Sequence, residues 1–291
     1  MQQFTLRSCK RELAGYFWET SAPRGVICLL HGIGDHCMRF SHIAEEWGRR
    51  GFSVFAFDMQ GHGHSPGPVG YIGKRHEILS DIDSLVTVAS VHCPDSPAFL
   101  FGHSMGGNLA LYYRLVKDHP RVAAYLVNAP WIVLGDSAST ARLAAYYLAK
   151  RTFPKYKNLK SVDPKDFAVD PSVREKYLND PLVHPYISPL TAFERLADAA
   201  EILSRAGERR KPVYLMHGSD DRICSPAGSR RFARKAGGLC TYRELPGLRH
   251  EALNEPGFAK LIGDMCLWLD RFCPSPENIQ KNENECINIH Q

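Results

Sequence analysis

Short apolar runs that alternate with helical patterns restrict the fold of this chain more than any other feature. Five of these runs have the length and composition of buried strands, and a sixth run is weaker. Strands that are apolar on both faces and separated by helices predict a mostly parallel sheet with helices on each side. The expected strands are 26–31, 53–58, 97–102, 123–128, 213–217 and 242–245, and the expected helices are 40–50, 76–92, 107–118, 227–236 and 258–272.

The alternation stops in a proline-rich stretch near the middle of the chain. This stretch contains helical fragments, among them 138–150, but no convincing strand. The pattern predicts a helical cap inserted into one α/β domain rather than a second domain. A chain of 291 residues is long enough for such a core without disulfides or metals. We expect core parts at 1–131 and 196–275, a cap at 132–195 and a frayed tail at 276–291.

Composition excludes several classes of protein. With 44% hydrophobic and 23% charged residues, the chain has the usage of globular proteins, not of collagen-like or disordered ones. The longest apolar stretches, such as 143–149, are far shorter than the roughly 18 residues that a membrane span needs. No apolar run follows the basic residues of 1–13, so we expect no secretory signal. Nine cysteines without a CxxC pair indicate reduced thiols in a cytoplasmic protein, not a zinc ribbon or a disulfide framework.

The basic residues raise the question of an anionic partner. The net charge is +5, and clusters lie at 209–211 and 230–235. Nucleic-acid binding would combine such clusters with stacking aromatic residues or a known reading motif, and the sequence contains neither. We therefore expect no nucleic-acid partner and interpret the clusters as solvated helix faces. Mild attraction to an anionic lipid surface, at the membrane periphery, is compatible with the same charge.

The segment Gly102-His103-Ser104-Met105-Gly106 follows an apolar run and precedes a helical pattern. A G-x-S-x-G motif in this context forms a sharp turn from strand to helix that exposes the serine hydroxyl above the sheet. The glycines allow the backbone to pass close to its neighbours. The helix that begins behind the serine supplies free amides and a positive dipole for a developing oxyanion. We therefore expect Ser104 to be a nucleophile.

A serine nucleophile needs a base and an acid that orients the base. On this type of scaffold they follow in the order serine, acid, histidine. Of the 13 histidines, His250 alone follows the last expected strand and precedes the final expected helix. Two adjacent acids, Asp220 and Asp221, follow the strand at 213–217 and lie on the same rim of the sheet as Ser104. Spacing alone leaves the choice between the two acids open.

Two further loops follow strands at this rim. The small residues of 30–36 suit a backbone amide that points into the site and forms half of an oxyanion hole. In the loop 58–65, His62 and His64 have the spacing of metal ligands, but the acid and histidine that a metal-dependent hydrolase would also need do not follow. We expect no metal there. Instead, these histidines and Asp58 are predicted to hold a tight loop by hydrogen bonds.

The candidate residues lie in five segments, HGIGDHCMRF (31–40), FDMQGHGHSPG (57–67), FGHSMGGNLA (101–110), HGSDDRICSPAGS (217–229) and LRHE (248–251). Together these segments resemble α/β-hydrolases of the monoacylglycerol lipase and lysophospholipase group. The resemblance implies the α/β-hydrolase fold and catalysis without a cofactor. It selects Asp221 as the acid, because in this group the acid directly precedes an arginine. It also implies an oxyanion hole formed by the amides of Ile33 and Met105, and it places Cys224 near the acyl site.

The expected function is therefore that of a serine hydrolase with the triad Ser104, Asp221 and His250, acting on monoacylglycerols or related single-chain lipid esters. Within enzymes, the alternatives are a carboxylesterase for small soluble esters, a thioesterase or a perhydrolase with the same triad. An epoxide or haloalkane hydrolase would need an aspartate in place of the serine. A ligand-binding module of the same fold is the alternative outside enzymes, and loss of a triad member would favour it. No member is lost here.

The sequence of the expected cap contains the residues that bear on the choice of substrate. Leu143, Tyr146 and Tyr147 are spaced i, i+3 and i+4 and form one apolar stripe on an expected helix. Packing onto the core is the simplest explanation of such a stripe. The sharper hypothesis is that the stripe covers an acyl tunnel and that its outer edge contacts lipid aggregates.

Overall fold

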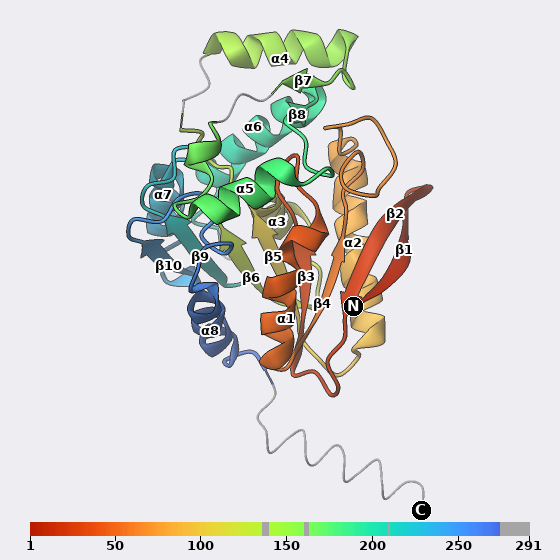
Figure 1. Ribbon diagram of the computed structural model, residues 1–291, viewed down its shortest axis with the longest axis vertical. Coiled ribbons are helices and arrows are strands. Elements are labelled where there is room, and N and C mark those ends of the chain that lie inside the picture. Colours follow the sequence, from red (N-terminus) through yellow and green to blue (C-terminus); the bar gives the residue numbers. More distant parts are fainter. Residues whose placement is uncertain (136–139, 160–162, 209, 274–291) are drawn as a thin grey trace, which may run out of the picture.

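An eight-stranded sheet forms the centre of the molecule, with helices on both of its faces (Figure 1). The computed structural model describes residues 1–135, 140–159, 163–208 and 210–273, without the side chains of 140–144, 158 and 159. Across the sheet the strands follow the order β1 (Gln2–Ser8), β2 (Arg11–Trp18), β4 (Phe52–Phe57), β3 (Gly25–Leu30), β5 (Ala98–His103), β6 (Val122–Asn128), β9 (Val213–Gly218) and β10 (Cys240–Leu245). Strand β2 pairs antiparallel with β1 and β4, and the other neighbours are parallel. The prediction of a mostly parallel sheet is confirmed.

All six expected strands are present, as β3, β4, β5, β6, β9 and β10, but the sequence analysis missed the hairpin of β1 and β2. Its two turn residues, Cys9 and Lys10, have φ angles of 44° and 64°. Two-residue hairpin turns of this kind usually carry Asn-Gly or Asp-Gly, so the ordinary turn signal is absent. The strand β1 also lies at the sheet edge with most of its side chains exposed, and it therefore lacks the apolar run of an inner strand.

Helices cover the two faces as expected. They are α1 (Ser41–Arg49), α2 (Arg75–His92), α3 (Met105–Val116), α7 (Pro226–Ala236) and α8 (Phe258–Leu269), with short 3₁₀ turns η1 (Cys37–Phe40) and η3 (Gly237–Leu239). Helices α1 and α8 pack on one face, and α2, α3 and α7 pack on the other. Along β3, Val26, Cys28 and Leu30 belong to one core and Ile27 and Leu29 to the other. This alternation explains why the whole strand is apolar.

The chain between β6 and β9 lies above the carboxyl ends of the parallel strands (Figure 1). It contains α4 (Thr140–Thr152), β7 (Asn158–Leu159), η2 (Pro164–Asp166), α5 (Pro171–Asn179), β8 (Tyr186–Ile187) and α6 (Pro189–Ser204). One expectation needs correction here: strands β7 and β8 form a short antiparallel pair where no strand was expected. Helix α6, which packs against both α3 and α4, continues across position 195/196, where we expect the cap to end.

The prolines that interrupt the sequence pattern begin two of these helices. Asp170 and Ser188 cap α5 and α6, and each is followed by a proline at the first helical position. Proline fits there because that position needs no amide donor. Among the described helices, none combines the length and the apolarity required to cross a bilayer. The expected frayed tail at 276–291 lies outside the described residues.

The turn from β5 into α3 leaves no room for side chains on its glycines. A Cβ added to Gly106 would lie 2.1 Å from the carbonyl oxygen of Leu30, and one added to Gly102 would lie 2.2 Å from the carbonyl oxygen of Gly106. Helix α3 therefore begins in direct contact with the end of β3. Between the two glycines, Ser104 has a φ of 55°, a region that residues with a Cβ rarely adopt.

We expect Gly106→Ala to destabilise the protein by about 1–3 kcal/mol, because the methyl group must displace backbone rather than a flexible side chain. Gly238→Ala is the matched control, since no atom lies within 4 Å of the Cβ that it would add. Urea unfolding of the two variants measures the difference. Equal midpoints for both variants and the wild type would show that the β5–α3 turn tolerates a side chain.

Candidate active site

Ser104 lies at the turn between β5 and α3 and is 4% exposed. Its backbone is held from both sides. Its amide donates to the carbonyl of Asn128 at 3.0 Å, and its carbonyl accepts from the amides of Asn108 and Trp131, each at 3.0 Å. A strained φ persists only where surrounding bonds determine the conformation, and three such bonds are present here. The hydroxyl is thereby held in one place at the rim of the sheet.

The structure brings Ser104, His250 and Asp221 together in one hydrogen-bonded line. His250 Nε2 lies 2.9 Å from Ser104 Oγ, and His250 Nδ1 lies 2.7 Å from Asp221 Oδ2. An ionised carboxylate only accepts, so Nδ1 carries the proton and Nε2 accepts from the hydroxyl. All three residues are buried. Chemically, this arrangement can remove the serine proton as the oxygen attacks an electrophile.

Asp221 and its neighbour Asp220 have different environments. Asp220 is exposed and accepts from the Ser219 hydroxyl. Asp221 is buried, and its Oδ1 accepts from the amides of Ile223 and Cys224 at 2.8 and 3.0 Å. Burial acts to raise the pKa of Asp221, but the nearby histidine charge and the hydrogen bonds to Oδ2 outweigh it and lower that pKa below its usual value. The tertiary structure thus separates two acids that spacing along the sequence left equivalent.

The two residues expected to form an oxyanion hole belong to the start of α3 and to the loop after β3. Met105 is the first residue of α3, so its amide has no acceptor within the helix and lies at the positive end of the helix dipole. Ile33 is buried in the loop after β3 and follows Gly32. A Cβ on Gly32 would lie 3.4 Å from the Ser104 Cβ, so this loop passes close to the serine.

The loop after β3 is anchored by His31. Its Nδ1 donates to the carbonyl of Gly32 at 2.7 Å, and its Nε2 accepts from the amide of Met59 at 2.9 Å. Burial lowers the pKa of His31 and favours the neutral ring that these two bonds require. The loop beside the serine is therefore tied to the loop after β4.

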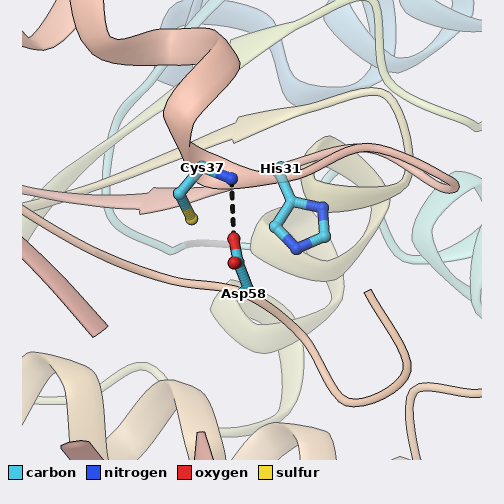
Figure 2. Close-up of side chains that lie close together, drawn as sticks. All are labelled: His31, Cys37 and Asp58. Atoms are coloured by element: carbon cyan, nitrogen blue, oxygen red, sulfur yellow. Dashed lines mark hydrogen bonds between the residues drawn. The ribbon is translucent and has the colours of Figure 1, made fainter. Parts of the chain in front are cut away.

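His31, Cys37 and Asp58 come close enough together to be considered as a metal site (Figure 2). Their ligand atoms lie within 4.8 Å of one another. Figure 2 shows that Asp58 accepts a hydrogen bond from the Cys37 amide, at 2.8 Å. The second oxygen of Asp58 accepts from the Tyr16 hydroxyl and from the His64 amide, both at 2.9 Å. Burial raises the pKa of the Cys37 thiol well above its usual value and so opposes the thiolate that a metal would need.

The hydrogen bonds of Asp58 explain the cluster of His31, Cys37 and Asp58 as a structural one, because they join β2, the loop after β4 and the start of η1. The loop 58–65 is closed as predicted by hydrogen bonds of Asp58 and by His62, whose Nδ1 lies 3.1 Å from the carbonyl of Gln60. Burial lowers the pKa of His62 well below its usual value, so its ring is neutral.

Sequence reasoning missed an ion-pair network behind the site. The guanidinium of Arg39 contacts Glu251 at 2.5 and 3.1 Å and Asp35 at 3.2 Å. Glu251 follows His250 in sequence, and Asp35 belongs to the loop after β3. The same guanidinium stacks on Tyr177 of α5, 4.6 Å from the ring centre. Arg39 thus joins the two loops of the site to the cap; a four-residue spacing between Asp35 and Arg39 was the only available signal.

The other predicted site residues occupy varied positions. Cys224 is 1% exposed, and its amide reaches Asp221. Tyr146 is half-buried and packs against the core. Tyr147 is 45% exposed, with its ring 5.7 Å from that of Phe193. Leu143 belongs to α4, but its side chain lies outside the described residues.

The chain is similar to known proteins over most of its length. Residues 21–257 match the family Hydrolase_4, described as "Serine aminopeptidase, S33". A monoacylglycerol lipase of Mycolicibacterium smegmatis is 29% identical over 249 residues, covering 85% of this chain and 88% of that protein. An abhydrolase domain-containing protein of Dictyostelium discoideum is 30% identical over 98% of this chain, and this chain spans 30% of that protein's length.

A solved structure, that of Paleococcus ferrophilus monoacylglycerol lipase, superposes with a TM-score of 0.81 at 28% identity and covers 89% of this chain and 98% of the other. The sheet and the helices on both of its faces agree with this superposition. The chain therefore belongs to the Hydrolase_4 family and has the α/β-hydrolase fold.

Proposed function

We propose that this protein is a serine hydrolase that cleaves the ester bond of monoacylglycerols through an acyl-enzyme on Ser104. The observation that carries the proposal is the hydrogen-bonded line from Ser104 Oγ through the His250 ring to Asp221. The similarity to monoacylglycerol lipases supports the choice of substrate.

The geometry accounts for each step of such a reaction. His250 Nε2 takes the proton from Ser104 as the oxygen attacks the ester carbonyl. The negative charge that develops on the carbonyl oxygen is stabilised by the amides of Met105 and Ile33. His250 then passes its proton to the departing glycerol oxygen. In the second half of the cycle the same ring deprotonates a water that releases the fatty acid. Asp221 stabilises the imidazolium in both halves.

The same triad can serve other acyl substrates, and the substrate rather than the chemistry separates the alternatives. The family description names a serine aminopeptidase, which cleaves an amide. A small-ester carboxylesterase and a thioesterase use the same nucleophile. The cap lies over the carboxyl ends of the strands, so its residues are the ones positioned to select an acyl chain.

A substrate panel of monoacylglycerols, lysophospholipids, acyl thioesters, short nitrophenyl esters and aminoacyl amides tests the proposal. A buried acyl chain gains about 0.8 kcal/mol per methylene, so four added carbons contribute about 3 kcal/mol, or roughly a hundredfold in kcat/KM. We expect monoacylglycerols of medium or long chain to be cleaved best. Ser104→Ala should lower turnover on the order of 10⁶-fold, and labelling by a fluorophosphonate should be lost. A preference for acetyl or butyryl esters would favour the small-ester alternative, and preference for amides would favour the peptidase.

We expect Asp221→Asn to lower kcat by about 10⁴-fold, because an amide cannot stabilise the imidazolium and favours the wrong ring tautomer. Asp220→Asn is the matched control, one residue away on the same loop but exposed. It should retain near wild-type turnover. Loss of activity in the control with activity retained in Asp221→Asn would assign the acid to Asp220.

We also propose that the outer side of the cap contacts lipid surfaces. Leu148, Phe153 and Tyr156 are 65%, 65% and 66% exposed; we call these three apolar side chains of α4 and the segment after it the outer patch. Helix α4 lies at the far end of the molecule from α8 (Figure 1). Exposed apolar side chains of this size commonly mark binding surfaces. Basic residues interleave with them, and each can add about 1 kcal/mol of attraction to an anionic membrane; they are Lys150, Arg151, Lys155 and Lys157.

The double variant Leu148→Ser with Phe153→Ser should bind anionic phospholipid vesicles more weakly than the wild type in flotation assays. Its turnover of vesicle-borne monoacylglycerol should fall severalfold, while its turnover of a water-soluble ester stays unchanged. Leu267→Ser is the control, because Leu267 is 71% exposed on α8, away from the cap. Equal vesicle binding by the double variant and the wild type would remove the patch from the lipid interface.

A further inference from the structure

A second histidine contacts the carboxylate of Asp221. His217 lies in β9 and is fully buried. Its Nε2 is 3.0 Å from Asp221 Oδ2 and 2.8 Å from the carbonyl oxygen of Cys224. Asp221 Oδ2 thus lies between two imidazole rings, that of His250 and that of His217.

The partners of His217 determine which ring nitrogen carries its proton. A carboxylate oxygen and a carbonyl oxygen both only accept, so Nε2 must be the donor. Its Nδ1 lies 2.7 Å from the hydroxyl of Ser229, which can donate to it. Ser229 is fully buried in α7. Every polar atom of the His217 ring therefore has a partner, and the hydroxyl from α7 stabilises the tautomer that donates to Asp221.

Among the described residues, four groups donate hydrogen bonds to the carboxylate of Asp221. Two backbone amides bind Oδ1, and the two histidines bind Oδ2. A carboxylate held at both oxygens cannot rotate about its Cβ–Cγ bond without breaking several bonds. The orientation of the His250 ring depends on that oxygen, because Nδ1 has its partner there at 2.7 Å.

Packing alone does not require a histidine at this position. The preceding residues of β9, Val213 to Met216, are apolar or aromatic and equally buried, and a phenyl ring has nearly the same shape as an imidazole. A buried polar ring costs free energy unless its nitrogens are hydrogen-bonded. Here both nitrogens are used, and one of them is directed at the acid of the triad.

We propose that His217 is a positioning residue of the hydrolase: it fixes Asp221 Oδ2 for His250, and Ser229 keeps it in the donating tautomer. This role rests on the proposed function, because it acts through the triad. It adds a histidine and a serine to the groups on which the reaction depends, although neither of them touches the substrate.

Two substitutions of His217 separate positioning from packing. His217→Phe keeps the shape of the ring and removes both nitrogens, whereas His217→Gln places an amide donor about as far from the backbone as Nε2. A hydrogen bond to a charged group is worth about ten- to a hundredfold in an equilibrium constant. We expect kcat per active site, titrated with a fluorophosphonate, to fall by about that factor in His217→Phe with KM unchanged. His217→Gln should recover most of the loss.

Ser229→Ala provides a second variant that is less disruptive to the core. Removal of the hydroxyl allows the other tautomer of His217, in which Nε2 would direct a lone pair at Asp221. We expect a smaller loss of kcat, again with KM unchanged. Ser96→Ala is the control, since Ser96 is also a buried serine whose hydroxyl is bonded, to the carbonyl of Pro23 away from the site.

The rate of fluorophosphonate labelling reports the reactivity of Ser104 without reference to the natural substrate. If the wild-type protein is labelled rapidly but cleaves no monoacylglycerol, the proposed substrate is wrong. The labelling rates of the His217 variants can still be compared in that case. Equal labelling rates and equal kcat in the wild type and in folded His217→Phe would overturn the role of His217. Suppose that His217→Gln does not restore kcat and that Ser229→Ala has the same kcat as Ser96→Ala. The His217 ring would then contribute packing alone.

Discussion

The close approach of α3 to the end of β3 is the constraint on which the site depends. No side chain fits on Gly106, because the carbonyl of Leu30 occupies the space where its Cβ would lie. This contact sets where α3 begins, and so sets the position of the Met105 amide. It also brings the loop after β3 against Ser104, through Gly32. The strained backbone of Ser104 follows from the same turn, and the bonds to Asn128, Asn108 and Trp131 hold it.

A second constraint is the cost of burying charge. Asp221 and Glu251 are both buried acids, and each is surrounded by donors: Asp221 by two amides and two imidazoles, Glu251 by the guanidinium of Arg39. Burial alone acts to raise the pKa of Glu251, but the charge of Arg39 and its hydrogen bonds lower it. An unpaired buried charge is strongly destabilising, so the folded structure must place these donors next to the two carboxylates. Each acid consequently ties a loop of the candidate site to another element of the structure.

Burial also keeps a second histidine, His103, uncharged beside His250. Its ring centre lies 4.9 Å from that of His250. Burial, with a further contribution from the charge of His250, lowers the pKa of His103 to about 3. The ring is therefore neutral at physiological pH and packs against His250 without competing with it for a proton. Its Nδ1 lies 2.9 Å from the side-chain amide of Asn128, whose carbonyl also holds the Ser104 amide.

The elements that sequence reasoning predicted well are those whose signal is local. A strand buried on both faces must be apolar throughout, and β3 to β6 and β9 were found for that reason. Strand β10 lies at the sheet edge and is only partly buried, which is why its signal was weaker. The hairpin of β1 and β2 was missed, because its turn adopts positive φ at Cys9 and Lys10 without a glycine and its outer strand is largely exposed. In the cap, strands β7 and β8 have only two residues each, which is too short to leave a periodic pattern.

The sequence by itself determined the strand-turn-helix motif of Ser104, the position of His250 before the last helix and the parallel sheet that aligns them. These follow from spacing along the chain and from the period of apolar residues. Spacing left the choice between Asp220 and Asp221 open and only the resemblance to a known family selected Asp221, whereas the hydrogen-bond partners Arg39, Glu251 and His217 became visible only in three dimensions. Adjacent residues on a loop point in different directions. The hydrogen bonds between His250 and Asp221 and between Arg39 and Glu251 join residues that are 29 and 212 positions apart, and they leave no trace in the local pattern. His217 and Asp221 are only four positions apart, but the apolar pattern of the strand does not show that their side chains meet. Only the packing of strands and loops at one rim of the sheet brings those groups within 3 Å or so of one another.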